Sequence, residues 1–203
     1  MTASFLLRLK PLVFIVCLLP LGFLVYGAIN NTLGVNPVEA MTRKTGDWTY
    51  YFLLITLSIT PLRQMLKQPW LIQYRRMFGL YVFFYACLHL LTYVWFDQYF
   101  NLSDIVRDII KRPFITLGML CWVLLIPLAV TSNQAMMRRL KKNWMRLHML
   151  VYPIAVVGLI HHIMMIKADY QQPLILGAVL LLLLGYRVYQ RNGFINARRN
   201  KKT

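Results

Sequence analysis

Four histidines are the residues of this sequence whose type and spacing could carry chemistry. His89 lies in one apolar segment, and His148, His161 and His162 lie together in another. Neutral imidazole is a common metal ligand and an axial ligand of haem iron. A single histidine in an apolar segment is more often a side chain that hydrogen-bonds between helices. Four histidines on only two segments instead indicate that the chain binds a metal or a metal-containing cofactor.

The composition shows what kind of protein must position these histidines. Of the 203 residues, 59% are hydrophobic and 14% are charged, with 23 Lys and Arg against 6 Asp and Glu. A soluble domain is about half apolar and about a quarter charged, so this chain has too few charged residues to cover a surface facing water. A nucleic-acid-binding protein would also be basic, but it would not contain long uncharged segments. A soluble globular protein and a nucleic-acid-binding protein are therefore both excluded. We expect the chain to contact membrane lipid and to bind no nucleic acid.

Six apolar segments predict six transmembrane helices. About 20 residues are needed to cross ~30 Å of hydrocarbon, and a helix satisfies its own backbone hydrogen bonds there. The predicted helices cover residues 11–29, 46–63, 77–96, 113–133, 147–166 and 170–189. We therefore expect an all-α polytopic membrane protein, with a six-transmembrane-helix bundle that makes residues 1–203 a single integral membrane domain. The first segment is interpreted as an uncleaved helix, because no small-residue cleavage signal follows Ala28.

The charged residues segregate between the two ends of these helices. With six spans both termini lie on one side, which receives seventeen basic residues, from Arg8 to Lys202, and no acidic one. The other side receives the remaining basic residues and all the acidic ones, which are Glu39, Asp47, Asp97, Asp104, Asp108 and Asp169. Positively charged loops favour the cytoplasmic side, so we expect both termini to be cytoplasmic.

Two loops on the opposite side are predicted to be partly helical. Asn36, Pro37 and Glu39 have the spacing of a helix N-terminus, with Gly46 as the stop of that short helix. Residues 103–111 place apolar and charged side chains on opposite faces of a second short helix. An amphipathic helix of this kind lies on a membrane surface, and we favour a role as an interfacial anchor over one as a platform for a partner.

The depth of each histidine in the membrane decides which of them can act together. Arg76 and Arg146 mark the starts of the third and fifth predicted helices, which run in the same direction. His89 lies 13 residues beyond Arg76, and His161 lies 15 residues beyond Arg146. At ~1.5 Å per residue these two histidines differ by about 3 Å in depth. A haem held edge-on between the third and fifth helices by this pair is sterically reasonable.

The half of the membrane nearer the termini offers fewer possible ligands for a haem iron. His148 lies about 20 Å further toward the termini, where the third helix offers Arg75 and Arg76 and no histidine. These arginines suit an anionic group such as a haem propionate or a flavin phosphate, or act as ordinary cytoplasmic charges. His161 and His162 also compete as ligands. An ideal helix puts His162 on the face of His148, but Pro153 between them can shift the phase.

Metal transport is a rival use for histidines in a membrane. Such a site usually adds carboxylates or thiolates, whereas the three cysteines, Cys17, Cys87 and Cys121, are scattered over three helices. Neither this class nor a cofactor-free scaffold accounts as well for the depth-matched histidines. An electron-transfer protein is therefore the preferred interpretation.

Motifs along nearly the whole chain resemble the MsrQ (YedZ) family, the haem-binding membrane subunits of bacterial MsrPQ methionine sulfoxide reductase systems. This family is part of the ferric reductase/NADPH oxidase-like transmembrane superfamily. The motifs are Gly34–Val38, Ile59–Arg63, Arg75–Arg76 with Gly79, His89–Leu90 with Tyr93, Arg112–Pro113, Leu117–Gly118, Thr131–Ser132, Trp144–His148 and His161. Together they are specific, although each alone would be weak.

The resemblance implies a ferric reductase-like bundle with haem iron ligands at His89, His148 and His161, and leaves His162 as an alternative. It implies haem b, one or two per chain, and FMN. The wider superfamily has two histidines on each of the third and fifth helices, and here the one nearer the cytoplasm on the third helix is missing. The family also implies a periplasmic partner, MsrP, which repairs oxidised proteins, and a location in the bacterial cell inner membrane.

We therefore expect an electron-transfer subunit that takes electrons from the quinone pool or a cytoplasmic flavin reductase and passes them to MsrP. Oxidases of the superfamily append a flavin and NADPH domain, whereas this sequence stops at Thr203, so electrons are expected from a separate donor. Reduction of the sulfoxide itself is expected on MsrP. The alternative within the same fold is a ferric reductase or a quinol-linked cytochrome.

Overall fold

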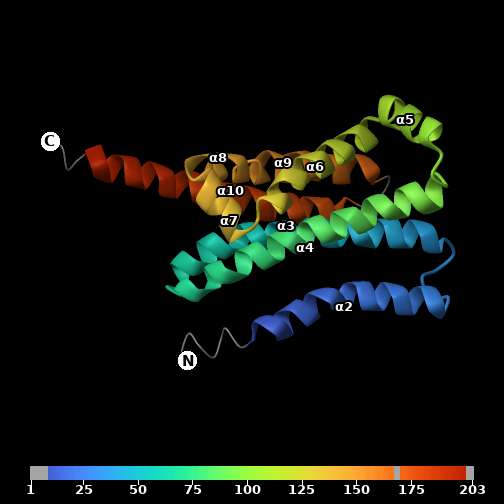
Figure 1. Cartoon of the computed structure of the whole chain (residues 1–203), viewed down its shortest axis with the longest axis horizontal. Helices are drawn as coiled ribbons and strands as arrows, with labels where there is room; N and C mark the ends of the chain where they lie inside the picture. The colour runs from blue at the N-terminus through green and yellow to red at the C-terminus, as the bar shows by residue number, and fades with distance from the viewer. Residues whose placement is uncertain (1–8, 167–169, 200–203) are drawn as a thin grey trace.

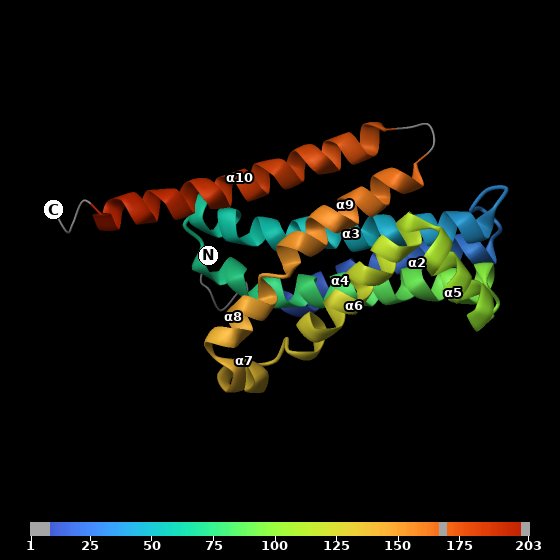
Figure 2. The same ribbon diagram turned by 90° about the horizontal axis from the view of Figure 1, so that it is seen from above.

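The computed structural model describes residues 9–166 and 170–199, and regular structure within these ranges is entirely helical. The long helices there are α2 (Lys10–Ile29), α3 (Pro37–Met65), α4 (Ile72–Thr92), α6 (Pro113–Val130), α9 (Val151–Met165) and α10 (Gln171–Arg199). The shorter elements are η1 (Pro69–Leu71), η2 (Tyr93–Asp97), α5 (Leu102–Lys111), α7 (Gln134–Leu140) and α8 (Lys142–His148). The long helices run side by side along one axis (Figures 1 and 2). The predicted all-α bundle is confirmed.

The bundle has two distinct ends. One end carries α5, and we call it the α5 end; at the opposite end α2 begins and α10 ends, and we call it the terminal end (Figures 1 and 2). Because the first long helix begins at the same end where the last one finishes, the chain runs along the bundle an even number of times. Arg8, Asp169 and Lys202, which contribute to the predicted charge segregation, lie outside the described residues.

Five segments of the described chain are long and apolar enough to cross a membrane, which makes this a multi-pass membrane protein. They are Lys10–Ile29, Pro69–Asp97, Pro113–Val130, Lys142–Met165 and Gln171–Asn192. The sixth long helix, α3, is less apolar because Thr, Ser and Tyr side chains are interspersed along it. It contacts α2, α4, α9 and α10, and Leu57 in its second half is completely buried. A helix that packs against protein on several faces needs fewer apolar side chains than one that faces lipid.

The start of α3 differs from the prediction in one respect. Asn36 is the N-cap, and its side-chain oxygen accepts a hydrogen bond from the Glu39 backbone N–H at 3.1 Å, as expected. The predicted stop at Gly46 is wrong, because α3 continues unbroken to Met65. Gly46 therefore lies inside a helix, and its missing side chain has a packing role that is described below.

The fifth predicted helix, residues 147–166, is instead two helices. The helix α8 ends at His148, a turn follows, and α9 begins at Val151. Pro153 lies in the first turn of α9, where its missing N–H costs no helical hydrogen bond. The turn is held by i→i+3 hydrogen bonds, from the Leu150 N–H to the Leu147 carbonyl and from the Tyr152 N–H to the Met149 carbonyl, so ideal α-helix arithmetic does not apply across it. The other predicted spans agree with the structure to within a few residues, apart from a longer α3 and α10 and an earlier start of α4.

Helix α2 is joined to the bundle by a tyrosine of α4. Pro20 lies inside α2, and beside it the hydroxyl of Tyr85 accepts from the Leu21 N–H at 3.3 Å and donates to the Cys17 carbonyl at 2.9 Å. The hydroxyl thus replaces a direct helical hydrogen bond, a common cause of a local helix bend. Tyr85 is completely buried, so α2 is held against α4 by both packing and hydrogen bonding.

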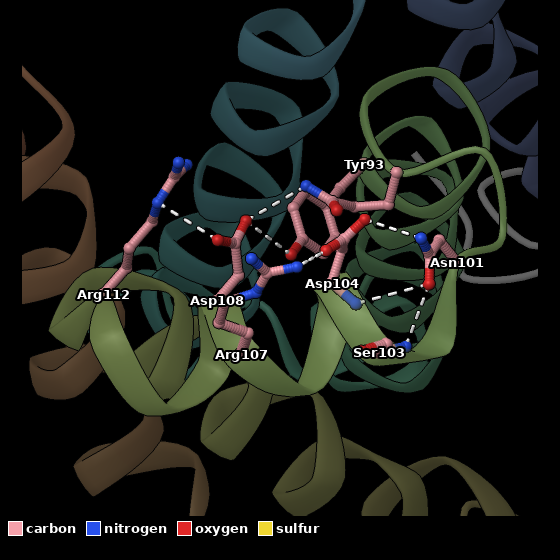
Figure 3. Close-up of polar contacts among 8 residues, drawn as sticks. Tyr93, Asn101, Ser103, Asp104, Arg107, Asp108 and Arg112 are labelled. Atoms are coloured by element: carbon pink, nitrogen blue, oxygen red, sulfur yellow. Dashed lines mark hydrogen bonds and ion pairs between the residues drawn. The ribbon is translucent and has the colours of Figure 1, made fainter.

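At the α5 end, Asp108 fastens α5 to the end of α4 (Figure 3). Its carboxylate accepts hydrogen bonds from the Tyr93 hydroxyl at 3.2 Å and the Gln98 amide at 3.0 Å, and pairs with Arg112 at 3.3 Å. The short helix α5 is amphipathic as predicted, but its buried face is rotated relative to the predicted apolar face. Asp108 and Ile109 are partly buried, whereas Ile110 is 77% exposed.

Candidate functional site

His89 occupies a specific position between α4 and α3. Its Nδ1 lies 2.8 Å from the carbonyl oxygen of Thr42 in α3. One helical turn later, Gly46 faces the imidazole so closely that a Cβ there would lie 3.1 Å from two ring atoms. The carbonyl therefore fixes the orientation of the ring, and the glycine leaves room for it.

His161 occupies the same kind of position between α9 and α6. Its Nδ1 lies 2.7 Å from the carbonyl oxygen of Phe114 in α6. One turn later comes Gly118, where a Cβ would lie only 2.9 Å from Cε1 of the ring. We call this combination, a carbonyl oxygen and a glycine four residues later on the neighbouring helix, a histidine seat. Two separate helix pairs thus provide identical seats.

The two seats bring His89 and His161 together. Their ring centres lie 6.1 Å apart, and the ring planes are inclined at 76°. Because a carbonyl oxygen only accepts hydrogen bonds, each Nδ1 must carry the proton, which leaves the lone pair on Nε2. Two imidazoles that bind one metal from opposite sides have ring centres roughly 6 Å apart, given metal–nitrogen bonds of about 2 Å. The pair therefore fits a haem iron with two axial histidines.

His162 faces a different set of residues. Its Nδ1 lies 3.9 Å from the carboxylate of Asp47, and its ring stacks on that of Tyr50 with centres 6.2 Å apart. Its Nε2 is buried without a hydrogen-bond partner among the described residues. The structure therefore pairs His161, and not His162, with His89, in the position that the ideal-helix argument had favoured for His162.

His148 lies near the terminal end and has different surroundings. Its ring stacks on Trp144 with centres 3.9 Å apart, and its Nδ1 lies 3.1 Å from the Trp144 carbonyl. Its Nε2 meets the Ser132 hydroxyl at 3.5 Å. Within the described chain these contacts of His148 include no second histidine.

Arg75 and Arg76 differ in their exposure. Arg75 is half-buried and lies within electrostatic reach of His148, whereas Arg76 is exposed. Among the described residues, no three His, Cys, Asp or Glu side chains gather as they would around an ordinary metal ion.

Several residues of the site could not be identified from their type. Thr42 and Phe114 contribute only backbone carbonyls, and Gly46 was assigned to a helix stop. Gly118 did carry a signal, because it belongs to the Leu117–Gly118 motif of the resemblance. The pattern that could have revealed the seats is a glycine at equal depth to a histidine on a neighbouring helix.

Comparisons with known proteins identify the family of the chain. Residues 45–159 match the family described as ferric reductase like transmembrane component. The chain is 50% identical over 184 residues to the protein-methionine-sulfoxide reductase heme-binding subunit MsrQ of Herminiimonas arsenicoxydans, covering 89% of this chain and 84% of the relative. The MsrQ proteins of Polaromonas naphthalenivorans and Rhodospirillum rubrum are 49% and 50% identical, over 94% and 87% of this chain and 87% and 85% of theirs. No solved structure matches the chain. The chain therefore belongs to the ferric reductase-like transmembrane family and, within it, to the MsrQ family.

Proposed function

We propose that this protein is a b-type cytochrome of the bacterial inner membrane that passes electrons to the periplasmic methionine sulfoxide reductase MsrP. The observation that carries the proposal is the pair of identical seats that hold His89 and His161 at the spacing of two axial ligands. The relatives' name as heme-binding subunits of a methionine sulfoxide reductase supports both the cofactor and the partner. In this reading, MsrP performs the sulfoxide reduction that repairs oxidised periplasmic proteins.

His89 and His161 are proposed to hold the haem iron through their Nε2 atoms. Haem b, when bound, supplies one-electron redox chemistry. The chain's own contribution is to keep each proton on Nδ1 through the Thr42 and Phe114 carbonyls, which fixes the tautomer and raises the basicity of Nε2. Gly46 and Gly118 let the rings approach the helices without displacement.

The terminal end is proposed to hold the second group. His148 is the proposed ligand of a second haem, and Arg75 and Arg76 are proposed to pair with a propionate or with the phosphate of FMN. The sequence contains no glycine-rich loop to cradle a phosphate, so arginine side chains would have to supply that contact. His162 remains an alternative ligand at the α5 end.

The direction of electron flow follows from the proposed orientation. Basic residues concentrate at the terminal end, so this end is placed in the cytoplasm and the α5 end in the periplasm. Electrons are proposed to enter from quinol or from a cytoplasmic flavin reductase, within a single membrane domain over residues 1–203. They would leave from the His89–His161 pair, which lies nearer the periplasmic face.

Two measurements test this function. The purified protein should show a haem Soret band that shifts on reduction, and its absence would contradict the electron-transfer proposal. The reduced protein should be reoxidised by purified MsrP carrying oxidised methionine substrate. Because the family description names ferric reductases, ferric iron is the matched second acceptor. Reoxidation by ferric iron alone would favour the ferric reductase alternative.

A further inference from the structure

Arg187 of α10 is turned into the bundle instead of toward the membrane surface. It lies within the apolar segment Gln171–Asn192, only partly exposed. One guanidinium nitrogen donates to the Leu57 carbonyl of α3 at 2.9 Å, and another donates to the Tyr152 hydroxyl of α9. The guanidinium also lies over the Tyr152 ring, 4.9 Å from its centre. An arginine that served only as an interfacial charge would instead extend toward the lipid headgroups.

These contacts leave the charge of Arg187 uncompensated. The Leu57 carbonyl is available because Pro61, four residues later, has no N–H to donate to it. This carbonyl and the Tyr152 hydroxyl are neutral acceptors, and the Nε of Arg187 is buried without any hydrogen-bond partner among the described residues. Arginine in a membrane interior almost always pairs with an anion or a functional group, because an unpaired charge there is costly.

The acidic residues of the described chain cannot supply that anion. They are Glu39, Asp47, Asp97, Asp104 and Asp108. They belong to the first half of α3, to η2 and to α5, and these segments lie toward the α5 end (Figure 1). Four of these acidic residues already lie within 4 Å of a basic side chain of that same end. The compensating charge for Arg187 must therefore come from outside the described protein.

A second cation lies near the first. Arg75 of α4 is within electrostatic reach of both Arg187 and His148. It is half-buried, and within the described residues no ion pair joins it to a carboxylate. The two guanidinium groups repel one another, and none of the acidic residues of the described chain lies at their end of the bundle. An oxyanion bound between them would stabilise both positive charges.

We propose that Arg187 and Arg75 together form a binding site for an oxyanion, a phosphate or a carboxylate carried by a cofactor or a lipid, beside His148. Arg187 contributes a guanidinium held in place by Leu57 and Tyr152, and Arg75 contributes a second positive charge from the first turn of α4. This proposal rests on the proposed function, because a cofactor can supply the oxyanion only if the protein binds haem or FMN. An anionic lipid would occupy it without any redox role.

The test compares four full-length variants with the unaltered protein, all purified from membranes. R187Q removes the charge but keeps hydrogen-bonding capacity, and R75Q removes the second cation without breaking any ion pair. R187K keeps the charge. R191Q is the matched control, because Arg191 lies one turn further on α10, is exposed and causes the same change in net charge. For each protein we would measure bound FMN by fluorescence after denaturation, haem b by absorbance and phosphatidylglycerol by mass spectrometry.

We expect R187Q and R75Q each to lower one of these three contents at least about tenfold, with R187K retaining most of it and R191Q all of it. The ligand that is lost identifies the source of the oxyanion. The absorbance of the haem at His89 and His161 reports folding in the same samples, and R75Q decides the outcome if R187Q does not fold. Unchanged FMN, haem and lipid in R75Q and in any folded R187Q would overturn the site. A protein that binds lipid there but no haem at all would instead refute the proposed function and leave the site standing.

Discussion

The two ends of the bundle surround their histidines in different ways. At the α5 end, His89 and His161 each have a carbonyl oxygen at Nδ1 and a glycine against the ring, from two unrelated helix pairs. At the terminal end, His148 hydrogen-bonds within its own segment, stacks on Trp144 and faces the hydroxyl of Ser132.

This difference shows that a histidine in a membrane helix does not define a cofactor site by itself. The seats at the α5 end fix the proton of each ring on Nδ1 and hold the two ring centres 6.1 Å apart, which suits a metal bound between them. The terminal end has one imidazole beside Arg75 and Arg187, which suits a group with negative charge. If each end holds the ligand proposed for it, variants of the residues around its histidine should affect that ligand alone.

The largest expected effect is the loss of a ligand at one end only. His161→Ala should abolish the haem spectrum of the α5 end, because one of its two axial nitrogens is gone. His148→Ala should leave that spectrum intact and remove only signals from the terminal end. Reduced-minus-oxidised absorbance spectra of the two purified variants would measure this. A loss of the same spectral component in both variants would show that the two ends are not independent.

The next effect in size is expected at the tighter seat. A Cβ added by Gly118→Ala would lie 2.9 Å from the His161 ring, so the ring must move away from the Phe114 carbonyl. Loss of such an orienting contact typically costs about 10–100-fold in metal affinity. Haem titration of the apoprotein would measure it. Gly22→Ala on α2 is the control, because nothing lies within 4 Å of a Cβ there.

A smaller effect is expected at the other seat. In Gly46→Ala the new Cβ would lie 3.1 Å from the His89 ring, so a shift of a few tenths of an ångström relieves the contact. We expect haem affinity to fall only a few fold. The helix itself should gain about 0.5–1 kcal/mol from alanine, so thermal unfolding of the apoprotein should not become easier. If Gly46→Ala lowered haem affinity more than Gly118→Ala, the distance between the new Cβ and the histidine ring would not determine the size of the effect.

The smallest effect is expected for His162→Ala. This ring faces Asp47 and Tyr50 and not His89, so the spectrum of the α5 end and its midpoint potential should stay close to those of the unaltered protein. A spectroelectrochemical titration would measure both. Complete loss of the haem in this variant would transfer the ligand role from His161 to His162.

Hydropathy, charge and spacing predicted much of this arrangement. They predicted the bundle, the equal depth of His89 and His161 and the isolation of His148, because these depend on rise per residue and on the length of apolar segments. Pro153 indicated that the helix phase could shift in this region, but the sequence did not locate the turn at Met149–Leu150 or decide between His161 and His162. Gly46 shows the same limit. A glycine that ends a helix and one that admits a neighbouring ring look alike until the neighbouring helix is placed.

The main-chain hydrogen bonds of the two seats have a consequence for the rate of electron exchange. The Thr42 and Phe114 carbonyls fix the imidazole protons of His89 and His161 on Nδ1. If these two histidines hold a haem iron as proposed, they would need no change of tautomer when the haem exchanges an electron, because each proton already has its acceptor. The site would then have a small inner-sphere reorganisation energy, and its two oxidation states should be nearly superimposable.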